Sequence, residues 1–288
     1  MSLRSLLGQN TTLASSARAF IARPTSTSTL SSTSILTRRV ILPAMPANMS
    51  TSGPVAVERP KSTFEDVTWK SFLTYEPELN ALAGSKYRHL ASDEAVERTK
   101  KSLEARGFKV HVVANKDEAF QKVVSLIPAG SSINTAHSTT LEETGITNYL
   151  MSSSHPWNNI RGTIIAEKDP IKQGDLRRKL GTTVDYFLTS MTAITESGEI
   201  AHGDQTGTKV GGVSFGAGNV IVVAGTNKIV KDEAEAWKRT TEFCLPFVSA
   251  YSRRAFKIKE AFMTNYEILR ATQNGRIQVV LVKEALGF

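Results

Sequence analysis

Two short apolar runs separated by a polar, glycine-rich segment constrain the fold of this chain more than any other feature. The runs cover residues 184–188 and 219–224, are rich in β-branched residues and are bounded by turn residues. Such runs are typical of strands buried in a parallel sheet. The segment between them collects acids, hydroxyls, a lysine and a histidine, which suits a ligand site at the carboxyl ends of the strands. Ordinary turns are the alternative, because glycine and threonine between strands also form these.

Strand and helix patterns alternate through the rest of the chain from residue 64. Helices of about 10–15 residues between strands indicate βαβ crossovers and a mainly parallel sheet with both faces covered. Residues 58–288 therefore read as one α/β domain. We expect helices over 64–83, 93–105, 117–126, 140–150, 171–180 and 231–243, and strands over 108–113, 132–136, 163–166, 184–188, 219–224 and 276–282.

The first 57 residues differ in composition from the rest. They are rich in serine, threonine and alanine, and they contain five arginines and no acid. This composition is typical of a mitochondrial transit peptide, whereas a generic disordered tail usually contains acids. We therefore expect 1–57 to be a disordered leader and the protein to reach the mitochondrial matrix. Met45 and Met49 are internal starts that would give an additional cytoplasmic form.

Charge and cysteine content exclude several classes of protein. The leader carries +5 of the formal net charge of +8, so the remaining chain has only +3 and no nucleic-acid-binding footprint is predicted. No apolar run approaches the ~20 residues that span a bilayer. The lone Cys244 excludes an intramolecular disulfide, a four-thiolate zinc site and a self-contained iron–sulfur cluster. We expect Cys244 to be a buried structural thiol, and we expect no metal and no cofactor.

The first candidate for chemistry is the turn that follows the predicted strand 132–136. His137 stands where that strand ends, and Ser138, Thr139 and Thr140 lead into a predicted helix. Helix N-termini present free N–H groups, so this turn can hold a phosphate or a carboxylate. A capping box made by the hydroxyls with Glu142 or Glu143 would explain the same residues, but it leaves His137 unexplained.

The second candidate is the polar centre of residues 185–232. Glu196 and Asp204 are candidate general bases there, and Lys209 and Lys228 are candidate anion contacts. A single lysine in such a loop is otherwise a solvated surface charge. The same segment includes Thr206, Gly207 and Asn227, which we add to the candidate ligand contacts.

Several strings in this chain resemble the LUD domain, the lactate-utilisation protein C family. They are IPAGSSINTAHSTTLEETGI, FLTSMTAITESGEI, GDQTGTKVGG, VIVVAGTNKIVKD and the closing RIQVVLVKEALGF. The resemblance covers roughly residues 64–288, with these strings in order. The resemblance implies a Rossmann-like three-layer α/β/α sandwich, similar to the group of ribose-5-phosphate isomerase, glucosamine-6-phosphate deaminase and CoA transferases. It also implies a link to the oxidation of lactate to pyruvate beside iron–sulfur or flavin partner proteins.

The same resemblance implies roles for the candidate residues. By analogy with the isomerases of this fold, Ser138, Thr139 and Thr140 would hold an anionic group together with Lys209. Asp204 or Glu196 would act as the acid or base, assisted by His137. A catalytic Asp204 predicts that the substitution Asp204→Asn abolishes turnover with little change in stability.

Three functions follow from these interpretations. The chain can be an accessory component of lactate or 2-hydroxy-acid oxidation, with electrons carried by partner proteins. It can be an independent enzyme that acts on a phosphorylated or carboxylated small metabolite by acid–base catalysis. It can also be a non-catalytic module that binds a small anionic metabolite.

Overall fold

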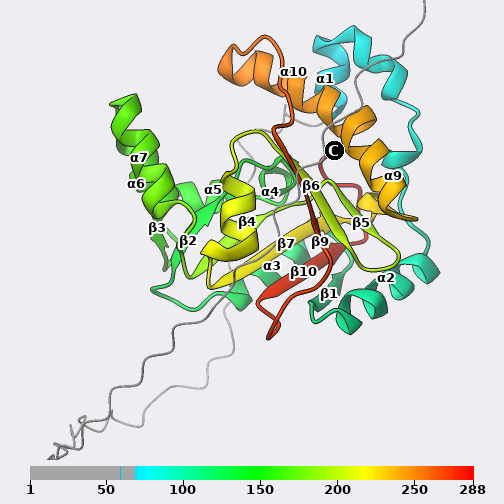
Figure 1. Ribbon diagram of the computed structural model, residues 1–288, viewed down its shortest axis with the longest axis horizontal. Helices are drawn as coiled ribbons and strands as arrows, with labels where there is room; N and C mark the ends of the chain where they lie inside the picture. Colours follow the sequence, from blue (N-terminus) through cyan, green and yellow to red (C-terminus); the bar gives the residue numbers. More distant parts are fainter. Residues whose placement is uncertain (1–58, 60–68) are drawn as a thin grey trace, which may run out of the picture. The chain divides into compact units, whose positions relative to one another are not determined.

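The computed structural model describes residue 59 and residues 69–288. The predicted leader and the start of the first predicted helix lie outside these residues. Within them, strands and helices alternate along the chain, as Figure 1 shows. None of the described helices is long and apolar enough to cross a membrane.

The main sheet has six strands, all parallel, in the order β1-β10-β7-β4-β2-β3. The long central strands β7 and β10 are almost entirely buried, and most of their residues are β-branched, which pack well on a sheet covered on both faces. The predicted mainly parallel sheet is therefore confirmed. Its strands are β1 (Lys109–Val113), β2 (Ser132–Thr135), β3 (Asn158–Asn159), β4 (Tyr186–Thr189), β7 (Asn219–Gly225) and β10 (Ile277–Val282).

Alternate residues of the central strands enter two different cores. Ile221 and Val223 of β7 join one core, while Val220 and Val222 join the other, as a side-chain period of two requires. Apolar residues of three helices cover the first face. They are α3 (Lys116–Leu126), α4 (Thr139–Glu143) and α5 (Ile146–Met151). The second face is covered by α2 (Asp93–Ala105), η3 (Gly212–Gly216) and strands outside the main sheet. This is the predicted three-layer α/β/α sandwich.

A second, four-stranded sheet in the order β8-β5-β6-β9 is a feature that the sequence analysis did not predict. Its strands are short, and two of them form an antiparallel hairpin inside the segment 185–232. Because β6 pairs in turn with β9, the hairpin joins this segment to the region 247–273. The strands are β5 (Ala193–Thr195), β6 (Ile200–Asp204), β8 (Ile229–Val230) and β9 (Asn265–Leu269).

Two predicted elements near the carboxyl edge of the sheet differ in kind or continuity from the structure. The prediction of a strand over 163–166 is wrong, since these residues belong to α6 (Ile160–Ala166), whose start is capped when Asn159 accepts a hydrogen bond from the amide of Gly162. The predicted helix 140–150 is divided into α4 and α5 at Gly145, which has a φ of 76°. The divided helix matters for function, because its first part turns several side chains toward the carboxyl edge of the sheet.

The remaining helices differ from the prediction mainly in length or are short additions to it. Pro77 ends the first predicted helix early, which gives α1 (Trp69–Tyr75) and η1 (Pro77–Leu82). The predicted helix 231–243 continues further than expected, through α9 (Glu233–Lys238), the π-helical turn η5 (Arg239–Cys244) and α10 (Leu245–Phe256). The others are η2 (Lys86–Arg88), α7 (Pro170–Leu180), α8 (Thr208–Gly211) and η4 (Thr226–Lys228).

Candidate functional site

The carboxyl ends of the main-sheet strands place four loops at one edge of the sheet. Loops after β2, β4, β7 and β10 contain His137, Ser190, Lys228 and Gly287. The contacts described below join the first, third and fourth of these residues to α4, and they join Ser190 to Lys228. In open α/β sheets, ligands bind at this edge. We call the polar residues gathered here the carboxyl-edge site.

The turn between β2 and α4 gives each of its polar residues a different partner. Ser138 is the N-cap of α4, and its hydroxyl accepts a hydrogen bond from the amide of Leu141 at 3.3 Å. Thr139 and Thr140 are buried in the first turn. The capping interpretation therefore accounts for Ser138, but Glu142 does not complete a capping box.

Glu142 instead faces the imidazole of His137. Oε1 of Glu142 lies 3.3 Å from Nδ1 of His137, while Oε2 is buried and has no hydrogen-bond partner. Burial raises the pKa of Glu142 to about 7 against the lowering effect of Arg161, and Glu143 raises it further. Burial, with the charges of Arg161 and Lys209, lowers the pKa of His137 to about 3. Near neutral pH the pair therefore consists of a half-protonated carboxyl and a neutral imidazole.

Two cations and one aromatic ring surround this pair. Arg161 donates hydrogen bonds from Nη1 to the carbonyl and hydroxyl of Thr135 at 3.1 and 3.2 Å, and its Nε has no partner. The ring of Tyr251 stacks on His137 with centroids 4.1 Å apart and an interplanar angle of 23°. Burial lowers the pKa of Lys209, whose charge reaches both His137 and Asp204. These groups can receive a carboxylate beside a proton donor.

Lys228 lies at the inner end of the carboxyl-edge site. Its side chain is buried, and Nζ donates to the hydroxyls of Thr140 at 2.9 Å and Ser190 at 3.0 Å. Burial, together with the positive charge of Arg239, lowers the pKa of Lys228 to about 7. A buried amine that loses its proton near neutral pH is typical of functional lysines.

The segment after β10 covers this lysine. The amide of Gly287 donates to Oε2 of Glu143 at 2.7 Å, and a β-carbon at this glycine would lie 2.4 Å from Oγ1 of Thr140 and 3.2 Å from Nζ of Lys228. Burial raises the pKa of Glu143, while that amide and Lys228 lower it. Asn227 ties the same segment down, because its Oδ1 accepts a hydrogen bond from the amide of Leu286 at 3.2 Å.

Asp204 holds the turn that leads into α8. Its carboxylate accepts hydrogen bonds from the amides of Thr206 at 3.0 Å, Lys209 at 2.8 Å and Val210 at 3.3 Å. Burial alone would raise its pKa, but these amides and the charge of Lys209 hold the pKa of Asp204 below its usual range. Such a carboxylate is a weak base at neutral pH, because proton uptake would disrupt the three hydrogen bonds.

The remaining predicted residues have separate positions. Thr206 is exposed and its hydroxyl lies 3.0 Å from that of Thr208, while Gly207 precedes α8 with a φ of 76°. Glu196 lies in the β5–β6 hairpin, where Arg98 of α2 donates to its carboxylate from Nε at 3.0 Å and Nη2 at 2.8 Å. Glu196 is thus paired with the helix that covers the second face of the sheet.

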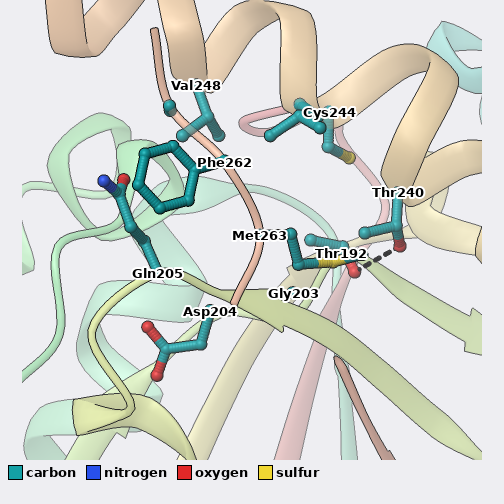
Figure 2. Close-up of a pocket in the computed structure, with 11 residues that line it drawn as sticks. Thr192, Gly203, Asp204, Gln205, Thr240, Cys244, Val248, Phe262 and Met263 are labelled. Atoms are coloured by element: carbon teal, nitrogen blue, oxygen red, sulfur yellow. Dashed lines mark hydrogen bonds between the residues drawn. The ribbon is translucent and has the colours of Figure 1, made fainter. Parts of the chain in front are cut away.

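A pocket opens beside Asp204, between the end of β6, helix α10 and the segment 261–263 (Figure 2). Its empty volume, including the mouth, is about 340 Å³. Gly203 lies on the β6 side, while Cys244 and Val248 line it from η5 and α10. Most of this lining is apolar, in contrast to the carboxyl-edge site.

Arg239, in the first turn of η5, is the largest fully buried side chain among the described residues. Its Nη1 donates to the carbonyl of Thr192 and to Sγ of Cys244, the latter at 3.0 Å.

The sequence did not identify Arg239, Arg161, Glu142 and Tyr251 as site residues. The sequence did offer a reason to consider Glu142, because a capping box explained the glutamate but left His137 unexplained. The other three residues lie far from the strand ends in the sequence, so no local pattern pointed to them.

In the part of the chain that the structure describes, no group of three or more acids, histidines or cysteines could hold a metal ion.

Comparison with known proteins gives a family. The family model of the LUD domain matches residues 96–282. Among solved structures, a DUF162 family protein from Deinococcus radiodurans is 14% identical, with a TM-score of 0.40, over 67% of this chain and 99% of its own. Ribose 5 phosphate isomerase A from Neisseria gonorrhoeae is 11% identical, with a TM-score of 0.24, over 50% of this chain and 56% of its own.

A search of curated proteins gave no match. The family match nevertheless extends from α2 through the last strand β10, and it includes His137, Glu142, Lys209 and Lys228. It covers more than half of the 288 residues. The chain therefore belongs to the LUD domain family.

Proposed function

We propose that this LUD-domain protein binds a small carboxylate metabolite of lactate utilisation, a 2-hydroxy or 2-oxo acid, and transfers a proton to or from it at the carboxyl-edge site. The observation that carries the proposal is the contact of Glu142 with His137, on which the positive charges of Arg161 and Lys209 act. A buried carboxyl whose pKa is about 7 can both give and accept a proton at neutral pH. Family membership supports the choice of metabolite class.

Each group around the pair has a task in this proposal. Arg161 and Lys209 attract the carboxylate of the metabolite, because both are partly buried cations close to His137. Glu142 is the acid or base, because its carboxyl can give or accept a proton near pH 7 and its Oε2 has no hydrogen-bond partner. His137, held by the ring of Tyr251, orients Glu142 and accepts a hydrogen bond while the carboxyl is protonated.

Proton exchange measured by NMR tests the proposal without requiring an electron acceptor. In deuterated buffer, a base that removes a methyl proton from pyruvate gives an enolate, and return of a deuteron replaces hydrogen by deuterium. We expect the full chain to accelerate this exchange and Glu142→Gln to reduce it by at least about a hundredfold, as for a lost general base. The exposed helix residue Glu104 provides the matched control, Glu104→Gln. Exchange at the uncatalysed rate, together with no calorimetric binding of lactate or pyruvate, would refute the proposal.

A second candidate function is that of an accessory component that docks on an iron–sulfur or flavin protein of lactate oxidation. Helix α7 favours it, because none of its eleven residues is buried and Ile171 is 78% exposed. Its last turn carries Arg177, Arg178 and Lys179. Such a helix suits an acidic partner surface. If this is correct, a redox protein that co-purifies with the chain should dissociate from the double variant Arg177→Glu, Arg178→Glu.

We also propose a mitochondrial location, which rests on the composition of residues 1–57 alone. A fluorescent protein fused after residue 57 should enter mitochondria. The same fusion with Met1 removed should remain in the cytoplasm if translation starts at Met45 or Met49. Absence of any mitochondrial signal from the intact fusion would contradict the proposal.

A further inference from the structure

The pocket beside Asp204 is a second binding feature that the proton transfer does not use. Val248 of α10 and Met263 of the segment 261–263 contribute apolar side chains to it (Figure 2). Ala261 of the same segment also lines it. Cys244 lines the pocket as well. Apolar concave surfaces with few polar groups are the usual seats of the apolar parts of ligands.

Helix α10 connects this pocket to the carboxyl-edge site. Cys244, Val248 and Tyr251 follow one another at spacings of four and three residues, so they share one face of the continuous η5–α10 helix. The first two line the pocket and the third stacks on His137. With a rise of about 1.5 Å per residue, Val248 and Tyr251 are separated by roughly one helical turn along the axis.

Lys209 makes the same connection from the other side. Its charge acts on Asp204, which lines the pocket, and on His137 at the carboxyl-edge site. Lys209 therefore acts electrostatically on one residue of each site, while Val248 and Tyr251 of α10 link the two sites by position. The carboxyl-edge site itself offers mostly charged and hydroxylated side chains, so it provides no comparable surface for an alkyl group.

Gly203 allows the pocket to have its present form. A β-carbon at this position would lie 2.6 Å from Sδ and 3.2 Å from Cγ of Met263, and 3.2 Å from Cγ2 of Thr240. The glycine thus leaves space that the methionine side chain enters. Methionine is unbranched and adaptable, so Met263 can move as an alkyl chain enters. Phe262 is 61% exposed and borders the same pocket.

We propose that this pocket selects the side chain of the carboxylate metabolite, and that the preferred ligand is a 2-hydroxy or 2-oxo acid with an alkyl chain longer than the methyl group of lactate. The inference rests on the proposed function, because it assigns the carboxylate to Arg161 and Lys209. It adds the substrate class: a chain that extends from the charged edge into the Val248–Met263 pocket.

Calorimetric titration of the full chain with a homologous series of straight-chain 2-hydroxy acids, starting at lactate, tests the inference. Burial of each added methylene should tighten binding by about fourfold, and the gain should stop once the pocket is full. Val248→Phe should remove the gain while the affinity for lactate stays within about twofold, because Val248 touches only the added carbons. Met263→Ala should have the opposite effect and extend the gain to longer chains.

The outcomes separate the inference from the function on which it rests. Equal affinity for lactate and for all longer acids would overturn the inference and leave the proposed function intact. Absence of binding for every acid would overturn both. If Val248→Phe does not fold, Met263→Ala still decides, since an unchanged chain-length profile in that variant contradicts a pocket bordered by Met263.

Discussion

Lys228 shows what it costs a protein to keep an ionisable group in its interior. The amine is 2% exposed, and its partners are hydroxyls rather than a carboxylate. Each unit of pKa shift corresponds to about 1.4 kcal/mol. A shift from 10.5 to about 7 therefore represents several kcal/mol of stability that the fold forgoes at acidic pH.

We predict that Lys228→Met raises the free energy of unfolding by roughly 2–4 kcal/mol at pH 6. Because the pKa of the folded state is the lower one, the wild-type amine contributes its full stability only above pH 10.5 and loses it as the pH falls through about 7. The advantage of methionine should therefore shrink toward alkaline pH. Urea denaturation at several pH values measures it, and a destabilised variant at pH 6 would contradict the prediction.

The stability contribution of Glu142 depends on pH in the opposite direction to that of Lys228. Its folded-state pKa of about 7 exceeds the ordinary value of 4.5 for a glutamate, so its contribution to stability is complete below pH 4.5 and is lost as the pH rises through about 7. Relative to the wild type, Glu142→Gln should gain roughly 2–3 kcal/mol in stability between pH 4.5 and pH 8. Thermal unfolding of both proteins across this range tests the sign, and a constant difference would show that Glu142 keeps an ordinary pKa.

At the scale of elements, the turn held by Asp204 shows how one carboxylate can organise a loop. An asparagine offers one oxygen where the carboxylate offers two for the amides of Thr206, Lys209 and Val210. We expect Asp204→Asn to lower the free energy of unfolding by about 1–2 kcal/mol. Chemical denaturation measures this loss. Activity loss at unchanged stability would instead support the catalytic role that the sequence suggested.

Helix α7 leads to the reverse expectation. Because Ile171 is 78% exposed and no residue of the helix is buried, Ile171→Glu should change the free energy of unfolding by no more than about 0.5 kcal/mol. A thermal scan of the isolated protein tests this. A larger loss would mean that Ile171 packs against another surface in solution.

Elements with strong local signals could be predicted from the sequence. Helix α2 begins after Ser92 and ends before Gly107 as expected, and the β-branched run of β7 gave its strand directly. The second sheet could not be predicted, because strands of two to five residues such as β5 carry too little periodicity. The polar hairpin between β5 and β6 looked like a loop for the same reason.

Those residues of the candidate site that directly follow a strand could be predicted from the sequence. His137, Thr140 and Lys228 follow β2 and β7, and parallel strands bring such positions together. Arg161 and Tyr251 reach the same place from α6 and α10, which tertiary packing alone determines. A local sequence pattern cannot predict contacts between residues so far apart in the chain.

At the scale of the whole molecule, Phe288 packs in one aromatic cluster with residues from distant parts of the chain. The ring of Phe288 stacks on Phe247 with centroids 5.3 Å apart and meets Phe72 edge-on at 6.0 Å. Together they link β10, α10 and α1, and they hold Gly287 over Lys228.

We expect Phe288→Ala to lower the free energy of unfolding by about 3 kcal/mol, as for other buried phenylalanines. Because the variant also loosens the cover on Lys228, amine-selective labelling of this residue should become faster. Mass spectrometry of labelled peptides measures it, with the exposed Lys172 as an internal reference. A labelling rate that does not change would show that Gly287 stays in place without the aromatic ring.

Helix α4 has only five residues, yet nearly every one of them serves a different neighbour. Thr140 meets Lys228, Leu141 enters the core, Glu142 faces His137, and Glu143 holds Gly287. In a saturation mutagenesis screen, most substitutions at each of these four positions of α4 should therefore impair the protein. Growth scores alone would merge packing defects with chemical ones, and separating them would require abundance to be recorded alongside activity for each variant.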